Sequence, residues 1–371
     1  MSEWNQFRGD ERNTARLEEG VGPVLKPTDA WTVELRGPVA CPPVLDHDTV
    51  YVGTSEGTLT ALDFQGRRRW VYDTTAPTTL APAICGHRVV FPLDDRLLAL
   101  DSPTGDLEWD HPIDGLYTTP PTAEGDLVLV GTNRGVIAIR ADSGTVIWDT
   151  ALEGGAVGAP VFDDGRAYVA TRDEQVRALD LGSGESVWSA PTDGTAVGGV
   201  TRADDRVYVA DDDGTLLALG ADTGQTWFTY QIRASFTAAP TVLEGEDTLF
   251  VAADDETLHV TDTTFGNRKL RGFLFSKSGL SLDGTPTCDP IVVGSVLFVA
   301  DDVGGLYAID ATDPDFFWHR PLEAAVAATP AASVDPRGGR ATHGADSDEF
   351  GRLFLGDEDG RLRCLTWEGT P

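Results

Sequence analysis

The stretch LVLVGTNRGVIAIRADSGTVIW, residues 127–148, decides the fold. It contains an alternating apolar run, a turn with glycine, a second alternating run, another glycine turn and a tryptophan. Alternation with a period of two residues, bounded by glycine and aspartate, predicts short β-strands joined by hairpins. No repeat shows apolar residues at the i, i+3, i+4 spacing of a helix over a dozen residues, which excludes a helical solenoid.

The same arrangement recurs along the whole chain, and the tryptophans give its period. Successive gaps between the six tryptophans from Trp31 to Trp227 are 39, 39, 39, 40 and 39 residues. Trp318 follows after a gap of 91, which fits two longer repeats with one tryptophan missing near Leu270. Four short strands in a period of about 40 residues make a propeller blade. We therefore predict an all-β fold, an eight-bladed β-propeller of four-stranded antiparallel blades.

The two ends of the chain complete each other in this prediction. The last apolar pair, LFLGD from Leu353 and LRCLT from Leu362, has no fourth strand after it. The first tryptophan of the repeat, Trp31, lies in AWTVEL, residues 30–35, without the two strands that should precede it. We predict a lead-in segment at 1–28 and a single propeller at 29–371. Its eighth blade is shared between residues 29–36 and 325–367, which leaves no open seam.

The net charge of −32 arises from 60 acidic and 28 basic residues, of which only Lys26, Lys269 and Lys277 are lysines. Such a surface repels phosphates, so nucleic-acid binding is excluded. It indicates a protein adapted to high salt, where screening over about 3 Å at 1 M salt removes self-repulsion. An acidic surface for a partner is the alternative, but the charge is spread along the chain.

The opening residues MSEWNQFRGD have neither the basic nor the apolar region of a secretory signal. No apolar run approaches the length of about 18 residues that a transmembrane segment needs. Four isolated cysteines, Cys41, Cys85, Cys288 and Cys364, lie in apolar strand-like stretches and are expected to be buried thiols. These features together predict a cytoplasmic location.

The recurring AxDxxTGxxxW pattern resembles the repeat of the pyrroloquinoline-quinone-like (PQQ-like) β-propellers, here of haloarchaeal type. The opening WNQFRGDERNT from Trp4 is similar to the segment that precedes the first blade in that family, so the resemblance covers residues 4–371. It implies that the tryptophan of each repeat docks between neighbouring blades. The tryptophans assigned this role are Trp31, Trp70, Trp109, Trp148, Trp188, Trp227 and Trp318.

The resemblance specifies a fold more than a function, because the family includes quinoprotein dehydrogenases, barrel-assembly scaffolds and propellers attached to kinases. The dehydrogenases hold the quinone against a ring of two adjacent disulfide-bonded cysteines, beside a calcium ion and an aspartate base. This sequence has no adjacent cysteines and no long insertions between strands. We therefore expect no catalytic residues and no pyrroloquinoline quinone, while a Ca²⁺ ion remains open.

Carboxylates cluster in six of the eight turns between the second and third strands of the repeats. Equivalent turns of a propeller fall on one face, so these residues should form a ring of negative charge near the channel. Turn chemistry and solvation in salt explain the pattern; the alternative is a face for a basic partner or for Ca²⁺ or Mg²⁺. The members of this acidic set are Asp94, Asp95, Asp173, Glu174, Asp211, Asp212, Asp213, Asp254, Asp255, Asp301, Asp302, Asp357 and Asp359.

Two irregular segments interrupt the repeat. Residues 266–284 replace the usual ending of the sixth repeat and contain a basic and apolar patch, which is either a degenerate blade edge or a contact site for a partner. Its members are Arg268, Lys269, Arg271, Phe273, Phe275 and Lys277. Residues 333–350 form a polar, glycine-rich insertion that is expected to be a surface loop.

The sequence thus predicts a non-catalytic propeller scaffold that binds other proteins in a high-salt cytoplasm. The competing hypothesis is a quinone- or metal-dependent oxidoreductase that uses the acidic mouth of the channel. The identity of the partner and the oligomeric state stay open.

Overall fold

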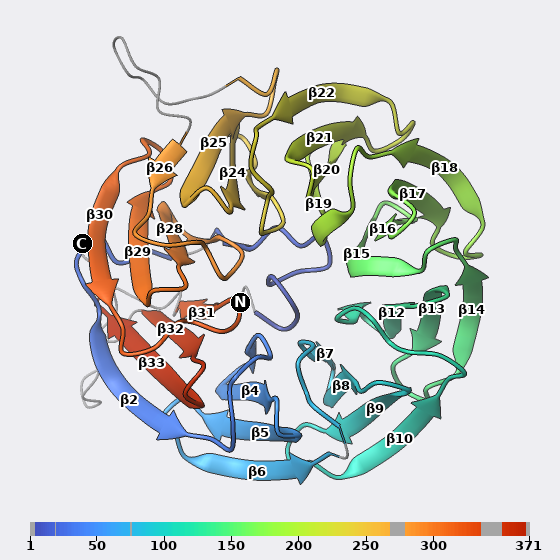
Figure 1. Cartoon of the computed structure of the whole chain (residues 1–371). Helices are drawn as coiled ribbons and strands as arrows, with labels where there is room; N and C mark the ends of the chain where they lie inside the picture. Colours follow the sequence, from blue (N-terminus) through green and yellow to red (C-terminus); the bar gives the residue numbers. More distant parts are fainter. Residues whose placement is uncertain (1–3, 19, 75, 268–278, 335–350, 369–371) are drawn as a thin grey trace.

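The computed structural model describes residues 4–18, 20–74, 76–267, 279–334 and 351–368. All regular secondary structure in these ranges is β-strand, and Figure 1 shows the sheets arranged around a ring. The chain is an all-β propeller built of four-stranded antiparallel sheets. Among the described residues there is no helix long and apolar enough to cross a membrane.

In the first half of the chain, each group of four successive strands forms an antiparallel sheet in chain order, with the first strand innermost. The first three sheets comprise β3 (Val44–Asp46), β4 (Thr49–Thr54), β5 (Thr58–Asp63) and β6 (Arg68–Asp73); β7 (Ala83–Cys85), β8 (Arg88–Pro92), β9 (Arg96–Asp101) and β10 (Leu107–Pro112); and β11 (Thr122–Glu124), β12 (Leu127–Thr132), β13 (Gly135–Arg140) and β14 (Val146–Ala151). The stretch quoted first, residues 127–148, thus forms β12, β13 and the start of β14.

The next two groups join into one eight-stranded sheet, because their inner strands pair in parallel at Ala159 and Gly199. The first group comprises β15 (Ala156–Asp163), β16 (Arg166–Thr171), β17 (Gln175–Asp180) and β18 (Ser186–Pro191); the second comprises β19 (Ala196–Ala203), β20 (Arg206–Asp211), β21 (Thr215–Gly220) and β22 (Thr226–Gln231). Glycine makes this approach possible, since a Cβ on Gly158 would lie 2.2 Å from Cα of Gly199.

Two of the three remaining sheets recruit a strand from the N-terminal part of the chain. The three sheets comprise β23 (Thr241–Leu243), β24 (Thr248–Ala253), β25 (Thr257–Asp262) and β26 (Gly279–Ser281); β27 (Ile291–Val293), β28 (Val296–Ala300), β29 (Gly305–Asp310) and β30 (Phe316–Pro321), joined by β1 (Arg16–Leu17); and β31 (Ala331–Val334), β32 (Gly351–Gly356) and β33 (Arg361–Trp367), joined by β2 (Thr28–Glu34). The strand β2 pairs antiparallel with β33, with Trp31 opposite Cys364.

The tryptophans of the repeat join each sheet to the next one through their indole nitrogens. Each Nε1–H donates to a backbone carbonyl that lies about 32 or 33 residues further along the chain, in the turn between the third and fourth strands of the next sheet. The pairs are Trp31 with Phe64, Trp70 with Ser102, Trp109 with Ala141, Trp148 with Leu181 and Trp188 with Ala221, all at 2.8 or 2.9 Å.

The glycine of the same turn allows the indole to lie against the backbone. Gly184, for example, has a φ of +73°, and a Cβ on it would lie 2.6 Å from Cε3 of Trp148. Any other residue would be strained by the backbone angle and would push the ring away. The glycine and the tryptophan four residues after it therefore take part in two successive contacts, because Gly184 receives Trp148 and Trp188 in turn lies against Gly224.

The assignment of Trp227 to this buried position is wrong, because Phe228 occupies it. Phe228 pairs with Ala218, as Trp188 pairs with Ala178, and it lies against Gly266. Trp227 is 56% exposed; its Nε1–H donates to the carbonyl of Thr264, and the guanidinium of Arg206 lies 4.4 Å from its ring centre. The gap of 39 residues from Trp188 to Trp227 matches most of the earlier gaps, but the repeat is 40 residues long here and therefore places Phe228 at the position of the tryptophan.

The segment before β2 takes the place of the missing turn in the last sheet. Trp318, in β30, donates its Nε1–H to the carbonyl of Pro23, and Trp367, in β33, donates to the carbonyl of Val21, at 2.8 and 2.7 Å. Two tryptophans near the end of the chain thus bind residues near its beginning. The tryptophan missing near Leu270 lies outside the described residues.

Residues 4–17 cross the central opening of the ring and bind the inner strands of successive sheets (Figure 1). Carbonyl oxygens of this lead-in, or the side chain of Gln6, accept backbone N–H groups from seven positions. The pairs are Trp4 with Leu45, Asn5 with Ile84, Gln6 Oε1 with Ala123, Glu11 with Phe162, Arg12 with Arg202, Ala15 with Val292 and Leu17 with Gly294. The lead-in is therefore part of the packed interior.

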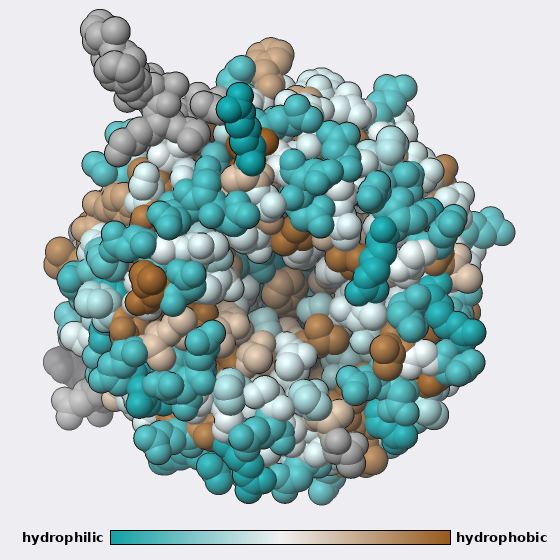
Figure 2. All heavy atoms as spheres, in the orientation of Figure 1, coloured by the Kyte–Doolittle hydropathy of each residue, from teal (hydrophilic) through white to brown (hydrophobic). Residues whose placement is uncertain are grey.

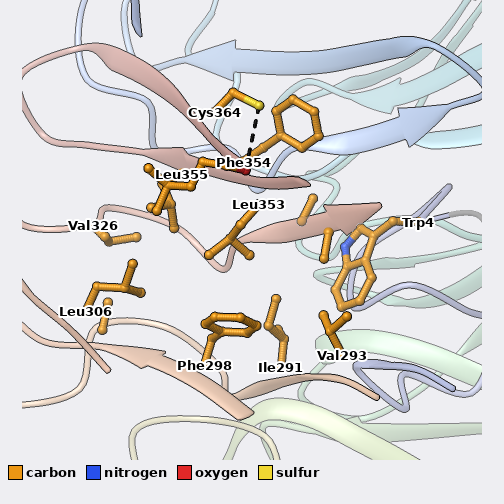
Figure 3. Packing of buried hydrophobic residues seen from close by; sticks show 14 of the residues in the cluster. Trp4, Ile291, Val293, Phe298, Leu306, Val326, Leu353, Phe354, Leu355 and Cys364 are labelled. Carbon is orange, nitrogen blue, oxygen red and sulfur yellow. Dashed lines mark hydrogen bonds between the residues drawn. The ribbon is translucent and has the colours of Figure 1, made fainter. Parts of the chain in front are cut away.

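Side chains of the lead-in are buried among those of the sheets. Trp4 is 2% exposed and packs in the cluster that contains Ile291, Val293 and Phe298, as Figure 3 shows. Arg8 is completely buried and donates from Nη2 to the carbonyl of Pro240 at 2.6 Å. The segment thus joins sheets that are far apart in the sequence.

Candidate functional site

The two ends of the central opening differ in what surrounds them. The lead-in binds inner strands close to their hairpins with the second strands, as at Leu45 in β3 and Ile84 in β7. The turns between second and third strands lie at the other end of the sheets, because neighbouring strands are antiparallel. We call this second end the mouth. Figure 2 shows a face of the ring that is hollowed at its centre, with hydrophobic surface among hydrophilic side chains.

The turns at the mouth carry the predicted acidic set, but three of its carboxylates are buried. Asp211, Asp301 and Asp357 are 1%, 0% and 3% exposed. Asp211 accepts the backbone N–H of Thr215 at 2.7 Å and that of Gly194 at 3.1 Å. The first bond closes the turn itself, and the second holds the turn against the segment that enters the same sheet. Burial raises the pKa of Asp211.

The same bonding recurs in the other sheets at the mouth. Asp301 accepts the N–H groups of Gly305 and Gly284, and it also accepts the hydroxyl of Tyr307. One residue later, exposed carboxylates bind the entering segments. These bonds join Asp212 to the N–H of Thr195, Asp302 to that of Thr285 and Asp254 to that of Ser235.

Further members of the acidic set lie against cations. Asp173 receives two hydrogen bonds from the guanidinium of Arg177, at 3.0 and 2.5 Å, and these hydrogen bonds hold the pKa of Asp173 below its ordinary value. Asp255 lies 3.3 Å from Nε2 of His259. Two more contacts join Asp95 to Arg96 at 3.3 Å and Asp359 to Arg361 at 3.4 Å.

Three members of the acidic set face solvent with no ion pair or side-chain hydrogen bond among the described residues: Asp94, Glu174 and Asp213. Most of the predicted carboxylates thus bind backbone N–H groups or basic side chains of the same protein. This supports the explanation from turn chemistry over that of a cation-binding ring. The basic patch of Arg268, Lys269, Arg271, Phe273, Phe275 and Lys277 lies outside the described residues.

Within the described ranges, one group of side chains could bring three ligand atoms together, and it is not at the mouth. The ligand atoms of His87, Asp101 and Glu108 lie within 4.8 Å of one another on the sheet of β7–β10. Glu108 already forms ion pairs with Arg88 and His87. None of these residues belongs to the acidic set.

The cysteines do not fit the site of a quinone cofactor. Cys41, Cys85, Cys288 and Cys364 are buried, and they come from separate stretches of the chain. Burial raises the pKa of Cys41, Cys85 and Cys288 to about 12, so these thiols stay protonated. The pair of adjacent cysteines that holds the quinone in related dehydrogenases is therefore missing, and no step through this cofactor is derived.

A cavity of about 230 Å³ opens at the mouth, and no pattern in the sequence predicts it. Its walls mix apolar side chains with hydroxyl groups, one carboxylate and one guanidinium. The lining residues are Pro77, Thr79, Leu80, Pro92, Leu93, Asp94, Tyr117, Thr118 and Arg172. These residues come from the connections that enter the second and third sheets and from two turns, one of them in the sheet of β15–β18.

Backbone contacts fix the positions of the two charged residues that line the cavity. The N–H of Arg172 donates to the carbonyl of Gly155 at 3.2 Å, and the N–H of Tyr117 donates to the carbonyl of Asp94 at 2.8 Å. Gly154, with a φ of +76°, passes directly below the turn, where a Cβ would lie 2.5 Å from the N of Asp173. Rigid main chain therefore presents both charges.

The guanidinium of Arg172 differs from most others in this protein. Nearly all arginines in the described part of the chain bind a carboxylate; Arg172, Arg68 and Arg233 are exposed without a hydrogen bond or an ion pair. Of these three, Arg172 lines the cavity. In a chain of net charge −32, an unpaired cation at a cavity is the exception.

The repeats match a family model described as outer membrane protein assembly factor BamB, over residues 28–119, 114–201 and 183–325. The BamB of Yersinia pestis is 25% identical over 169 residues, which are 40% of this chain. The match spans 42% of the length of that relative.

Several solved structures are similar in fold. BamB of Moraxella catarrhalis has a TM-score of 0.71 and 20% identity, over 92% of this chain and 100% of that one. A europium-containing methanol dehydrogenase has a TM-score of 0.78 at 13% identity, over 96% and 90%. The quinohemoprotein alcohol dehydrogenase of Comamonas testosteroni has a TM-score of 0.74 at 14% identity, over 100% and 81%. At these identities the likeness concerns the fold alone.

Proposed function

We propose a scaffold function for this chain, which belongs to the PQQ-like repeat family. In this proposal it is a non-catalytic propeller that binds other proteins through its mouth, in a high-salt cytoplasm. The observation that carries the proposal is the use of the carboxylates at the mouth. Most of them bind backbone N–H groups or arginines of the same protein, as Asp211 and Asp173 do, and so hold a rigid rim instead of a reacting group.

The proposal includes the architecture of the ring. The four-stranded groups, counted through the eight-stranded sheet and with β2 added to β31–β33, make eight blades. The strand β2 closes the last of them, and residues 29–371 act as one unit. A rigid closed ring is a suitable scaffold, because little binding free energy is lost in ordering the ring when a partner binds.

Three truncated chains test the closure. A chain that begins at residue 4 should match the full chain in thermal stability, and one that begins at residue 18 loses the lead-in but keeps β2. A chain that begins at residue 37 loses both and should unfold at the lowest temperature, because β33 then has an unpaired edge. Full stability of this shortest chain would contradict the closure.

The function itself is tested by capture from native cells in molar KCl. The variant Asp94→Asn/Asp213→Asn removes two exposed charges at the mouth, and we expect it to lose the captured protein. The matched control, Glu34→Gln/Asp149→Asn, removes two exposed charges on the outer strands β2 and β14 and should retain it. Equal capture by both variants would count against the mouth as the binding face.

The competing function, an oxidoreductase, rests on the likeness to dehydrogenases of the same fold. It is tested by dye-linked oxidation of alcohols and sugars with added quinone and Ca²⁺. Because the chain lacks adjacent cysteines, we expect no rate above the background. A reproducible rate would replace the scaffold proposal.

A further inference from the structure

We propose that the cavity at the mouth binds the C-terminal end of a partner protein, with a basic residue followed by a final aliphatic residue and its free carboxylate. The inference rests on the scaffold function and names the chemistry of the partner. It starts from the unpaired guanidinium of Arg172, which lines the cavity and has no carboxylate partner in the described part of the protein.

Arg172 is suited to a carboxylate. A guanidinium offers N–H groups in a planar fork that matches the two oxygens of a carboxylate, and such pairs are the strong class of hydrogen bond. Elsewhere in this chain the carboxylate comes from the protein itself, as with Asp173 and Arg177. At Arg172 the fork faces solvent unused, so it is free to bind the carboxylate of a ligand.

The size of the cavity limits the rest of the occupant. Its volume of about 230 Å³ is smaller than the pockets of about 300–1,000 Å³ that hold drug-sized ligands. The space suits one residue at the end of a chain. Leu80, Leu93, Pro77 and Pro92 form the apolar part of the lining, and an aliphatic side chain at this last position fits against them.

The charges around the cavity favour a particular type of residue just before the last residue of the partner chain. Asp94 lines the same cavity without an ion pair, and Glu174, also unpaired, belongs to the same turn as Arg172. Carboxylates at this rim repel an acidic chain and attract a lysine or arginine. A carboxylate on Arg172 and a cation near Asp94 therefore describe a chain that ends in a basic and then an aliphatic residue.

The test uses the full-length protein in molar KCl and two labelled ten-residue peptides that end in Lys-Leu. One peptide has a free C-terminal carboxylate and the other has an amide. Fluorescence anisotropy should show that the free acid binds about tenfold or more tightly than the amide, because the amide lacks the charge that pairs with Arg172. Equal binding of acid and amide would overturn the proposal.

Two variants locate the contact. Arg172→Gln should weaken binding of the free acid by about tenfold or more and leave that of the amide unchanged. The matched control is Arg68→Gln, which removes an equally exposed and unpaired arginine from β6, and it should bind as the wild type does. Both arginines are exposed, so unfolding temperatures should be unchanged; equal loss in both variants would overturn the assignment to Arg172.

A competition experiment distinguishes two possible ligands of the cavity, the C-terminal end of a protein and a free amino acid. Leucine at millimolar concentration should not displace the acid peptide, because it lacks the basic residue beside Asp94; displacement would overturn the peptide occupant. The outcome is also distinct from that of the scaffold test. If the wild type captures a partner and Arg172→Gln captures it equally well, the inference fails while the scaffold function stands.

Discussion

Arg8 and Asp289 form an ion pair inside the ring, with Nη1 of the guanidinium 3.4 Å from Oδ1 of the carboxylate and side chains 0% and 8% exposed. Asp289 also accepts the N–H of Ala239 and the hydroxyl of Thr329. One carboxylate thus joins the lead-in to the segments that enter three other strands. The pair lies where the lead-in and three sheets meet.

Removing one member of this pair should destabilise the protein strongly. Arg8→Met leaves Asp289 without its cation, and Asp289→Asn leaves a buried guanidinium without its anion. Each is expected to lower the free energy of unfolding by about 3–5 kcal/mol. The double variant should lose less than the sum of the two, which chemical unfolding in molar KCl measures as a coupling energy. Additive losses would show that the two charges do not stabilise each other.

Replacing Phe228 by alanine should lower the free energy of unfolding more than replacing Trp227, although tryptophan is the larger residue. Phe228→Ala removes a side chain that is 7% exposed and packs against Gly266, so we expect a loss of about 3–5 kcal/mol. Trp227→Ala removes an exposed ring, one hydrogen bond and the contact with Arg206, and should cost only about 1 kcal/mol. Urea unfolding of both variants checks the order, and the reverse order would restore Trp227 as the docking residue.

The carboxylates at the mouth should separate into structural and free groups. Asp211→Ala leaves the N–H groups of Thr215 and Gly194 without an acceptor and should cost about 1–3 kcal/mol. Asp213→Ala, two residues away, removes an exposed group and should change stability by less than about 0.5 kcal/mol. Equal thermal unfolding of the two variants would contradict the role of Asp211 in the turn.

Asp173 should make the free energy of unfolding depend on pH in the acidic range. Its pKa in the folded protein lies below the unfolded value of about 3.9, because Arg177 donates to the carboxylate. Its contribution to stability is therefore complete above that value and is lost as the pH falls through the folded pKa. The stability difference between wild type and Asp173→Asn should be constant above about pH 5 and shrink below about pH 4.

The control for this titration is Asp213→Asn, at an exposed and unpaired position of the next sheet. Its difference from the wild type should stay near zero over the same range. If the difference for Asp173→Asn also stays constant down to pH 2, the contact with Arg177 does not stabilise the ionised form. Denaturant titrations at each pH, at constant KCl, give both curves.

The strands could be predicted from the sequence because each one is a local pattern. The run VYVAD from Val207 is apolar up to the aspartate that opens a turn, and it became β20 as expected, buried from Val207 to Asp211. The exception at Trp227 shows that tryptophan alone is not sufficient to assign positions in the repeat. Counting four residues from Gly224, as from Gly184 to Trp188, leads to Phe228, so the glycine was the better reference.

The candidate site could be predicted only in part. The sequence located the acidic turns, but not that Asp211 and Asp301 point inward to backbone N–H groups, because the donors at Gly194 and Gly284 belong to segments 17 residues away. The cavity of Arg172 combines turns and connections from separate sheets, so no local pattern describes it. Apolar and polar residues do not alternate in the lead-in, and its hydrogen-bond partners lie on several sheets that come together only when the ring has formed.

The bond between Trp367 and Val21 spans 346 residues of sequence, and it sets an order for how this chain comes together. Residues near the N-terminus are synthesised first, yet the strands that hold them are synthesised last. Contacts of such long range make folding slow, because the entropy of closing the loop is lost before the contact forms. The carbonyl of Val21 therefore waits for its tryptophan until the strand of Trp367 has been synthesised, and the contact cannot form earlier.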